Sequence, residues 1–599
     1  MCMIQRIKLV FKSIGYSFGL IYRSSKLLIL LYFALNLICA TFPLLSMYVL
    51  KYLLDILTAE SPNMTTVMIC IGMYVAAIVI LQGINSVQNV VYDSILKKSE
   101  HLYDCELSEK LAKLPMSIID TSSGKDMVDD VRHTKNTAVY LAFRIMRIIT
   151  LLYTFCVAFG TLITFNIWFS LLFLVLTVPG IILNVIFEKR TEDLRRKTAP
   201  DVRRFCYYRW MLTDAWPAKD IRMYDLTEPI KARYDTEKEE YRKANKRLDQ
   251  KKVMAFLLAE LIMRSGEIAF TVFVVLHALS GAVTIGNVTL YIGFALSASS
   301  SFQTMVSTLV MSYTRTTKMM GRFFEFLAIQ CPDESNGKRK LECFESLEFD
   351  NVCFKYPLTD RNVLSGVSFT LNRGDKLSIV GINGSGKSTI IKLMLGLYEI
   401  ESGQILINGF PMLDYDMKDV RALFSVLFQS FVMYPLTLRD NITLSDYDRS
   451  GNDSEIVESL KQSGVYDELQ PKLEDGLDSY MTRKFADKGT ELSKGQWQKI
   501  ALSRAYFKNA PIVIFDEPSA ALDAEAEDRI FKNFEAISDN KTGIMISHRI
   551  SSARMSNKII VLDGGKIVES GTHEELVACC GLYAKLYNLQ KEKYTLKEE

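Results

Sequence analysis

The chain has 599 residues, of which 49% are hydrophobic and 23% are charged. This length exceeds what one hydrophobic core supports, and the composition mixes membrane and soluble character, so at least two domains of different kinds are expected. The formal net charge is only +3 and no Lys/Arg-rich block stands out, which argues against nucleic-acid binding. The 11 cysteines show neither metal-ligand nor disulfide spacing and are expected to be reduced thiols.

Residues 1–25 are expected to form a helix that lies on the membrane surface. Ile4, Ile7 and Phe11 recur at helical spacing, with basic residues such as Lys8 between them. A basic amphipathic helix suits the membrane–water interface. The alternative is an ordinary amphipathic helix packed on protein. The segment lacks the short apolar core and cleavage site of a removable signal peptide.

Residues 26–325 are expected to form an all-α transmembrane domain with six spans. Each of six apolar runs is long enough to cross a bilayer, which takes about 20 residues. The runs lie near residues 27–50, 66–90, 138–160, 161–186, 254–279 and 288–312. Lys and Arg precede the first run and follow the second, fourth and sixth, whereas the short loop 279–287 has none. Because cytoplasmic flanks carry the excess of Lys and Arg, both termini are placed in the cytoplasm.

Two long polar loops, near 91–137 and 188–253, fall on the same cytoplasmic side. Their composition predicts helices that continue well below the membrane. Each has a break near its middle, at 114–124 and at 214–217, where Pro or Gly residues predict that a helix stops and restarts. Short elements are therefore expected at the two loop tips.

Five charged residues (Asp, Glu, Lys or Arg) fall inside the predicted spans. Glu260, Arg264 and Glu267 lie on one face of the fifth span, at spacings that allow pairing, and Arg144 and Arg147 begin the third. Charged groups tolerated in a bilayer usually face a cavity and mark a substrate pathway. The alternative is that these side chains sit at the inner headgroup level and snorkel to water.

Residues 326–343 form a polar, turn-rich linker, and the pattern changes after it. Between 344 and 599, short β-branched runs such as 377–380 and 512–515 alternate with helical stretches. This alternation is typical of an α/β domain with a buried, largely parallel sheet.

The segment 381–389 is a complete P-loop between an apolar strand and a helical run. Its residues with predicted nucleotide contacts are Gly381, Asn383, Gly384, Ser385, Gly386, Lys387, Ser388 and Thr389. The glycines let backbone N–H groups wrap phosphate, Lys387 balances phosphate charge, and the Ser388 hydroxyl is a candidate Mg²⁺ ligand.

Two carboxylates, Asp516 and Glu517, follow the apolar run 512–515 directly. The carboxyl edge of a buried parallel sheet is where ligands bind. Asp516 is therefore the predicted Mg²⁺ partner, and Glu517 the residue that polarises the water attacking the γ-phosphate. The alternative is a capped turn after a strand.

The segment 492–496, Leu-Ser-Lys-Gly-Gln, closely resembles the signature of the ATP-binding cassette (ABC) family, with Lys494 where that family usually has Gly. Ser493 and the Gly495 backbone offer donors at a helix start, next to Gln496, as a phosphate site would require. The resemblance implies that two such domains meet head to tail around two ATP molecules. One chain then supplies half of each site.

Four further residues resemble family elements in the family's order. Tyr356 resembles the aromatic that stacks on adenine, and Gln429 the glutamine that senses Mg²⁺. Asp523 matches the loop that communicates across the dimer, and His548 the histidine that contacts the γ-phosphate. The segment 483–491 departs from the acidic cross-linking loop of exporters, and Ala520 stands where Ser is commoner. These departures raise the possibility of two unequal ATP sites.

The whole chain resembles ABC exporter half-transporters, in which a membrane half precedes the nucleotide domain. The resemblance implies an ATPase that uses ATP and Mg²⁺ and pairs with a second half-transporter, either a copy or a related chain, in a bacterial plasma membrane. It implies that the loop tips 114–124 and 208–220 dock on nucleotide domains. Export of a peptide, lipid or amphipathic small molecule is expected. The alternatives are an importer on the same fold, and a nucleotide-gated channel or regulatory ATPase; the apolar runs exclude a soluble ABC ATPase.

Overall fold

A computed structural model describes residues 3–59, 64–332, 337, 339–485, 487–518, 524–547 and 550–595. The chain divides into two compact units. The first, here called the helical unit, comprises Met1–Ala112 and Asp126–Ile329, and the second, the sheet unit, comprises Lys113–Lys125 and Gln330–Glu599. The expected fold class, an α-helical membrane domain followed by an α/β domain, is confirmed.

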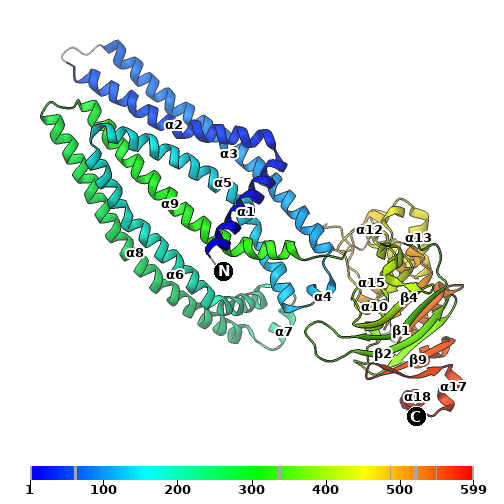
Figure 1. The fold of residues 1–599 in the computed structure, drawn as a ribbon. Helices are drawn as coiled ribbons and strands as arrows, with labels where there is room; N and C mark the ends of the chain where they lie inside the picture. The colour runs from blue at the N-terminus through cyan, green and yellow to red at the C-terminus, as the bar shows by residue number, and fades with distance from the viewer. Residues whose placement is uncertain are drawn as a thin grey trace. The chain divides into compact units, whose positions relative to one another are not determined.

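Six long helices that lie along one another make up most of the helical unit (Figure 1). They are α2 (Lys26–Leu57), α3 (Met64–Ala112), α5 (Ser122–Phe165), α6 (Ile167–Thr213), α8 (Thr227–Leu279) and α9 (Ile285–Ala328). The remaining helices before the linker are α1 (Met3–Ser24), α4 (Met116–Ile119) and α7 (Ala218–Met223). The short helix α4 lies within the first predicted break, and α7 starts directly after the second.

The helices are longer than the predicted spans, and one boundary differs. The third span was expected to end at residue 160, but α5 continues to Phe165 and α6 starts at Ile167. The break falls at Asn166, whose side-chain oxygen accepts a hydrogen bond from Trp168 N at 3.0 Å and so caps α6. Among the described residues, α2, α3, α5 and α8 are long and apolar enough to cross a membrane.

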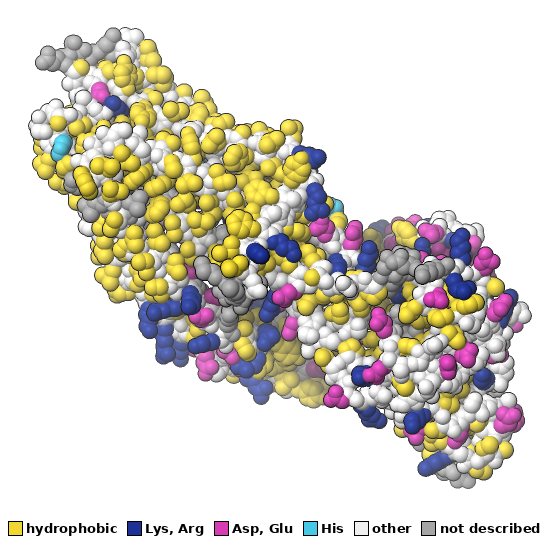
Figure 2. Space-filling view, in the orientation of Figure 1, with side chains coloured by type: hydrophobic (Ala, Val, Ile, Leu, Met, Phe, Trp, Pro, Cys, Tyr) yellow, Lys and Arg dark blue, Asp and Glu magenta, His cyan; other side chains and the backbone are white. Residues whose placement is uncertain are grey.

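The outer surface of the helical unit is apolar. Figure 2 shows hydrophobic side chains covering the face of this unit, with Lys and Arg side chains gathered at one end. Leu30, Val79 and Leu261 are among the exposed large apolar residues, whereas Ser99 and Thr134 are buried. A surface of this kind suits lipid rather than water.

One face of helix α1 packs against protein, and the opposite face is exposed. Ser17 is fully buried, and its hydroxyl accepts a hydrogen bond from Ala142 N at 2.9 Å. The Tyr16 ring lies 5.1 Å from that of Phe323. Ile4 and Phe11 are 64% and 71% exposed. The packed face is therefore the serine side of the helix, and the expected apolar stripe faces outward.

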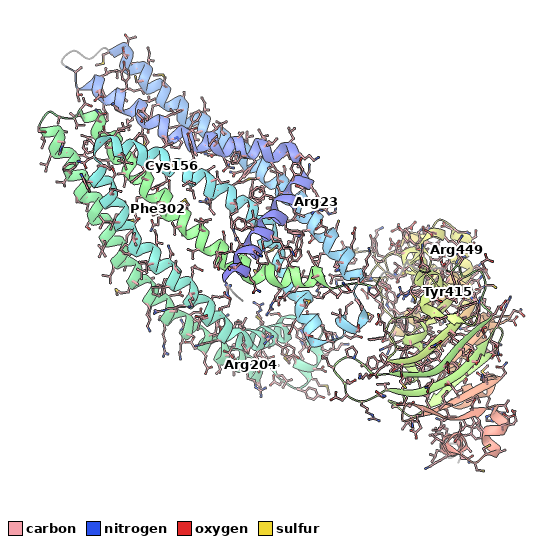
Figure 3. The ribbon with its side chains drawn as sticks, in the orientation of Figure 1. Arg23, Cys156, Arg204, Phe302, Tyr415 and Arg449 are labelled. Atoms are coloured by element: carbon pink, nitrogen blue, oxygen red, sulfur yellow. The ribbon has the colours of Figure 1, made fainter. Side chains whose placement is uncertain are left out.

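Polar contacts join α6 to α8 beyond their apolar stretches. Arg204 on α6 donates to Glu237 on α8, with Nε to Oε1 at 3.0 Å. In Figure 3, Arg204 is labelled at the far end of these helices, whereas Cys156 and Phe302 lie midway along theirs. The Phe302 ring stacks on Phe155 at 5.0 Å.

The main sheet of the sheet unit has six strands in the order β10-β9-β3-β8-β7-β6. Strands β3 (Lys376–Gly381), β6 (Phe424–Leu427), β7 (Ile512–Asp516), β8 (Thr542–Ile546) and β9 (Lys558–Asp563) pair in parallel, and β10 (Lys566–Gly571) pairs with β9 antiparallel. All five residues of β7 and of β8 are buried, as a sheet covered on both faces requires.

A second, antiparallel sheet was not predicted from the sequence. It has the order β2-β1-β4-β5, formed by β1 (Ser346–Phe354), β2 (Leu364–Asn372), β4 (Ser402–Ile407) and β5 (Phe410–Pro411). Burial alternates along much of β1 and β2, so one face of these strands packs inward. Phe349 and Phe369 stack across the two strands with ring centroids 4.8 Å apart.

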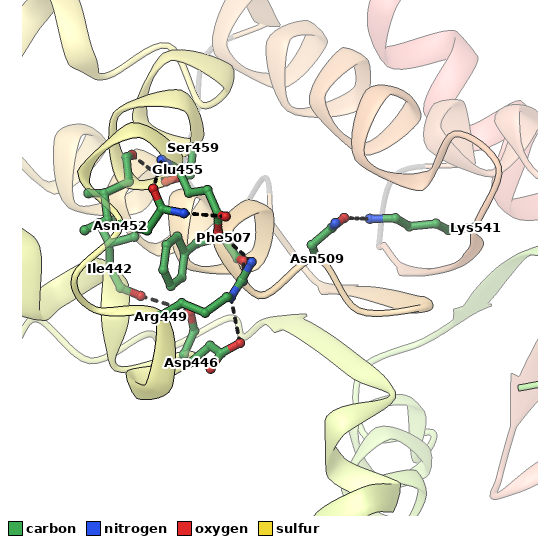
Figure 4. Close-up of polar contacts among 11 residues, drawn as sticks. Ile442, Asp446, Arg449, Asn452, Glu455, Ser459, Phe507, Asn509 and Lys541 are labelled. Carbon is green, nitrogen blue, oxygen red and sulfur yellow. Dashed lines mark hydrogen bonds and ion pairs between the residues drawn. The ribbon is translucent and has the colours of Figure 1, made fainter. Parts of the chain in front are cut away.

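Helices cover the main sheet and form a small subdomain beside it. They are α10 (Lys387–Met394), α11 (Met417–Ala422), α12 (Leu438–Thr443), α13 (Asp453–Gln462), α14 (Tyr466–Leu469), α15 (Lys494–Lys508), α16 (Ala524–Ser538), α17 (His573–Ala578) and α18 (Leu582–Thr595). Arg449 ties this subdomain together by donating to Asp446, Glu455 and the Phe507 carbonyl (Figure 4). These contacts tie the C-terminal end of α15 to the subdomain.

Candidate nucleotide site

The P-loop connects β3 to α10 through a backbone that favours glycine. Gly386 caps α10 with φ +103°, and a Cβ there would lie 2.7 Å from Leu364 Cδ2. Gly384 also has positive φ, at +78°. The first backbone N–H groups of α10 have no partner within the helix, so the loop presents donors where an anion binds.

Two buried side chains in this loop are arranged for a phosphate group. Lys387 is 5% exposed, and its Nζ donates to the carbonyls of Gly381 and Ile382, each at 3.0 Å. Ser385 is 2% exposed, and its hydroxyl has no hydrogen-bond partner. A buried hydroxyl without a partner is costly, so an incoming anion that accepts from it would remove a penalty.

The two carboxylates predicted at the end of β7 lie beside the P-loop. The Ser388 hydroxyl donates to Asp516 Oδ1 at 3.1 Å, and Lys387 Nζ lies 4.0 Å from Glu517 Oε1. Burial raises the pKa of Asp516, and the Ser388 hydrogen bond and Lys387 oppose this shift. Burial lowers the pKa of Lys387, and the two carboxylates oppose it. The oxygens of Ser388 and Asp516 form the kind of hard donor set that suits Mg²⁺.

Glu517 is held in an unusual backbone conformation. Its φ is +47°, in the left-handed region that non-glycine residues rarely adopt, and its N–H donates to the Ile546 carbonyl at 2.9 Å. The Gln429 amide donates to Glu517 Oε2 at 2.7 Å. Strain of this kind persists where surrounding contacts impose it, and it concentrates at functional sites.

Tyr356 contacts the P-loop helix α10. Its hydroxyl is 3.1 Å from the Thr389 hydroxyl, and Lys392 Nζ donates to it at 3.3 Å. The ring is partly buried, which leaves part of it for a further stacking partner. The predicted adenine contact is thus joined to the phosphate loop through one helix.

The segment 492–496 starts helix α15, as expected. Ser493 caps the helix, its hydroxyl accepts from Gln496 N at 3.3 Å, and the Gln496 side chain accepts from Ser493 N at 3.1 Å. Ser493, Lys494 and Gly495 are exposed. The contacts of the Ser493 and Gln496 side chains are local, and the helix start faces outward.

Two predicted site residues, Asp523 and His548, lie outside the described residues, as does Ala520.

Comparison with protein families accounts for both units. The model of the ABC transporter transmembrane region matches residues 29–302, and the ABC transporter model matches residues 364–520. Together these matches span the membrane helices, the P-loop and the Asp516–Glu517 pair. The chain belongs to the ABC transporters.

Two relatives of this ABC transporter match it over nearly their whole length. The subtilin transport ATP-binding protein SpaT of Bacillus subtilis is 29% identical over 100% of this chain and 97% of its own. The nisin transport ATP-binding protein NisT of Lactococcus lactis subsp. lactis is 28% identical over 97% of this chain and 96% of its own. The order of the two domains is therefore shared from end to end.

The fold also matches a solved transporter. The structure of a bacterial Atm1-family ABC exporter with ATP bound superposes with a TM-score of 0.74 at 22% sequence identity, covering 94% of this chain and 98% of that one. This ABC transporter therefore has the exporter fold, with a membrane domain and an ATP-binding domain in one polypeptide. The importer alternative is not favoured.

Next to the nucleotide site, the sheet unit of this transporter has a groove. It has a volume of ≈ 420 Å³, and its lining includes Phe428, Phe431 and Tyr434. Phe428 directly precedes Gln429, so the groove and the Glu517 contact share one loop.

Sequence reasoning missed two residues that support the site. Gln498 on α15 donates to the Pro518 carbonyl and so connects the signature helix to the segment after Glu517. Lys392 contacts Tyr356 from α10. Both contacts depend on the tertiary fold, because Gln498 lies 20 residues from Pro518 and Lys392 lies 36 residues from Tyr356.

Proposed function

We propose that this chain is one half of an ATP-driven exporter that moves a peptide out of the cytoplasm. The observation that carries the proposal is its end-to-end similarity to two transport proteins whose names specify subtilin and nisin. The P-loop geometry supports it, because a buried lysine, a partnerless serine hydroxyl and two carboxylates surround one loop. A lipid or an amphipathic small molecule is the alternative cargo.

In this proposal, Lys387 and Ser385 bind the phosphates of ATP, and Tyr356 stacks on its adenine. Ser388 and Asp516 would hold Mg²⁺, with Gln429 nearby, and the bound ion would supply positive charge against the phosphates. Glu517 orients and polarises the attacking water, since its carboxylate is fixed by the amide of Gln429. His548 is assigned to the γ-phosphate.

We assign the exposed start of α15 to the ATP site of a second subunit. Ser493, Gly495 and Gln496 would close over nucleotide bound to the partner's P-loop, and Asp523 would communicate across the dimer. The exposure of Ser493 and Gly495 and the local hydrogen bonds of the Ser493 and Gln496 side chains support the assignment of the helix start. The partner is a second copy or a related half-transporter, and binding of ATP brings the two sheet units together.

We place the cytoplasmic side at the end of the helical unit where Lys and Arg gather (Figure 2). Both termini and the ATPase domain then lie in the cytoplasm of a bacterial cell. The exposed apolar residues of α1, Ile4 and Phe11, would lie in the membrane interface.

We propose Glu267 as a contact for cargo in the membrane. The apolar stretch of α8 runs from Val253 to Leu279, so at 1.5 Å per residue Glu267 lies about 21 Å from one end and about 18 Å from the other. Arg264 pairs with Glu267 at 2.5 Å and with Glu260 at 2.9 Å. This depth is too great for snorkelling to the inner headgroups, which favours a role for the triad in the pathway.

Two arginines, Arg144 and Arg147, are proposed for the same pathway at the start of the apolar part of α5. Together with the triad, they would give the pathway charges of both signs. This arrangement suits a cargo that carries charged as well as apolar groups.

The test uses cells that lack this gene and are complemented with the wild-type chain or with Glu517→Gln. Mass spectrometry of the culture medium is expected to find peptides that appear only with the wild-type chain. Identical media, together with an ATP-dependent conductance in patches that hold the chain, would instead support the channel alternative.

A further inference from the structure

The first cytoplasmic loop tip belongs to the sheet unit. Residues Lys113–Lys125 lie between α3 and α5 in the sequence, yet they cluster with Gln330–Glu599. Within this segment, Met116 on α4 packs against the hydrophobic core of the sheet unit, and Tyr356 packs against the same core. Tyr356 and the loop are therefore connected, because both pack against the same hydrophobic core.

One polar contact fixes this loop to the region behind the P-loop helix. Tyr398 is 6% exposed and lies shortly after α10. Its hydroxyl donates to Asp120 Oδ2, at the end of α4 and 278 residues away in sequence. Burial and the Asp120 carboxylate raise the pKa of Tyr398, so the hydroxyl stays protonated and remains a donor at neutral pH. A hydrogen bond to a charged acceptor is among the stronger ones in proteins.

Tyr398 also contacts the predicted adenine-stacking ring. The rings of Tyr356 and Tyr398 lie 5.3 Å apart at an interplanar angle of 89°, the edge-to-face arrangement that aromatic pairs prefer. Phe354 contacts both rings, at 5.0 Å and 5.7 Å. Lys392 Nζ lies 5.2 Å from the Tyr356 ring centroid and 5.7 Å from that of Tyr398. The two tyrosines are thus held as one packed pair.

We propose that Tyr398 is a positioning residue that reports occupancy of the adenine position to the first cytoplasmic loop. A base stacked on Tyr356 fixes the orientation of that ring, its edge-to-face partner Tyr398 follows, and the Tyr398 hydroxyl holds Asp120. This route differs from the phosphate end of the site, where Gln429 contacts Glu517. The inference rests on the proposed function only in that Tyr356 must stack on the base of bound ATP.

The route makes the loop sensitive to the base and not only to the phosphates. ATP is expected to order residues 113–125, whereas inorganic tripolyphosphate, which has no base, is expected to leave them unchanged. Because the loop joins α3 to α5, ordering it would transmit base binding to two membrane helices.

The test is hydrogen–deuterium exchange of residues 113–125 in the full chain in lipid nanodiscs, with Glu517→Gln in every variant to keep ATP intact. Saturating ATP should slow exchange in this loop. Adding Tyr398→Phe, which keeps the ring and removes the hydroxyl, should make exchange with ATP roughly 5- to 10-fold faster. Asp120→Asn should give a similar change, and the double variant should add little to either, because both remove one hydrogen bond.

The matched control is Tyr415→Phe. Tyr415 is 5% exposed, lies in the same unit (Figure 3), and donates through its hydroxyl to the Ile407 carbonyl at 3.1 Å. This variant should leave ATP protection of residues 113–125 unchanged.

Binding of ATP, measured in parallel, separates the inference from the proposed function. If ATP binds and Tyr398→Phe leaves loop protection unchanged, or if tripolyphosphate protects the loop as well as ATP does, the positioning role of Tyr398 is wrong. If the chain with native Tyr398 fails to bind ATP, the proposed function itself fails.

Discussion

The two units differ in the apolar surface that they expose, although each also has a buried apolar core. In the sheet unit, Leu393 on the P-loop helix α10 is fully buried, whereas in the helical unit Leu30 is 70% exposed. Buried serines occur in both units, such as Ser13 and Ser17 in the helical unit and Ser425 in the sheet unit. The sheet unit is therefore built for water and the helical unit for lipid. We expect the functional polar side chains of the sheet unit to lie at the ends of its strands, and those of the helical unit to lie in its interior.

This contrast predicts that substitution of a single polar residue lowers activity most when the residue lies at a strand end of the sheet unit. The largest effect is expected for Glu517→Gln, which keeps the shape of the side chain but removes the carboxylate that polarises water. ATP hydrolysis by the chain in nanodiscs should fall by about 10²- to 10⁴-fold. The matched control is Glu535→Gln on the exposed part of α16, which should retain wild-type hydrolysis. Hydrolysis untouched by Glu517→Gln would overturn the catalytic assignment.

Removal of Mg²⁺ tests the donor pair formed by Ser388 and Asp516. Chelation with EDTA should lower ATP hydrolysis by about 10²-fold or more, because the ion neutralises charge that develops on the phosphates. Asp516→Asn should raise the Mg²⁺ concentration needed to restore activity. Full activity in EDTA would contradict the assignment.

Substitutions of two leucines, Leu393 and Leu30, test this difference in exposed apolar surface directly. Leu393→Ala removes a fully buried side chain and should destabilise the sheet unit by about 2–5 kcal/mol. Leu30→Ala, at an exposed apolar position, should change stability by less than about 0.5 kcal/mol in nanodiscs. Thermal unfolding of both variants gives the comparison, and equal shifts would show that Leu30 is covered by protein.

A smaller effect is expected when a charged residue of the helical unit is substituted. Glu267→Gln should reduce export of the cargo by about tenfold, the effect of one lost hydrogen bond to a charged group, while basal ATP hydrolysis stays near its wild-type rate. Glu240→Gln is the control, because Glu240 is an exposed carboxylate on the polar part of the same helix and should leave export unchanged. Equal export by wild type and Glu267→Gln would remove Glu267 from the pathway.

Local patterns were sufficient to predict the P-loop and the segment 512–517. Both combine a buried strand with polar residues at its end, so a short window holds the whole signal. The serine face of α1 was not predictable, because Ser13 and Ser17 are buried by other helices and not by their own polarity. Apolar periodicity pointed instead to Ile4, Ile7 and Phe11, which face outward.

Contacts between distant segments were also beyond sequence reasoning. The left-handed backbone of Glu517 depends on a hydrogen bond to Ile546. The contact of Tyr398 with Asp120 joins residues that a linear pattern cannot associate. The break at Asn166 was missed by six residues because apolar residues continue on both sides of it.

The central claim is that two chains complete each ATP site and thereby drive transport. It is tested most directly by ATP hydrolysis in nanodiscs that contain a mixture of two inactive variants, Lys387→Ala and Ser493→Arg. In a mixed dimer, one site combines both defects, and the other combines an intact P-loop with an intact signature helix. We expect each variant alone to be inactive and the mixture to recover a substantial part of wild-type hydrolysis. A mixture no more active than either variant alone would contradict the shared site.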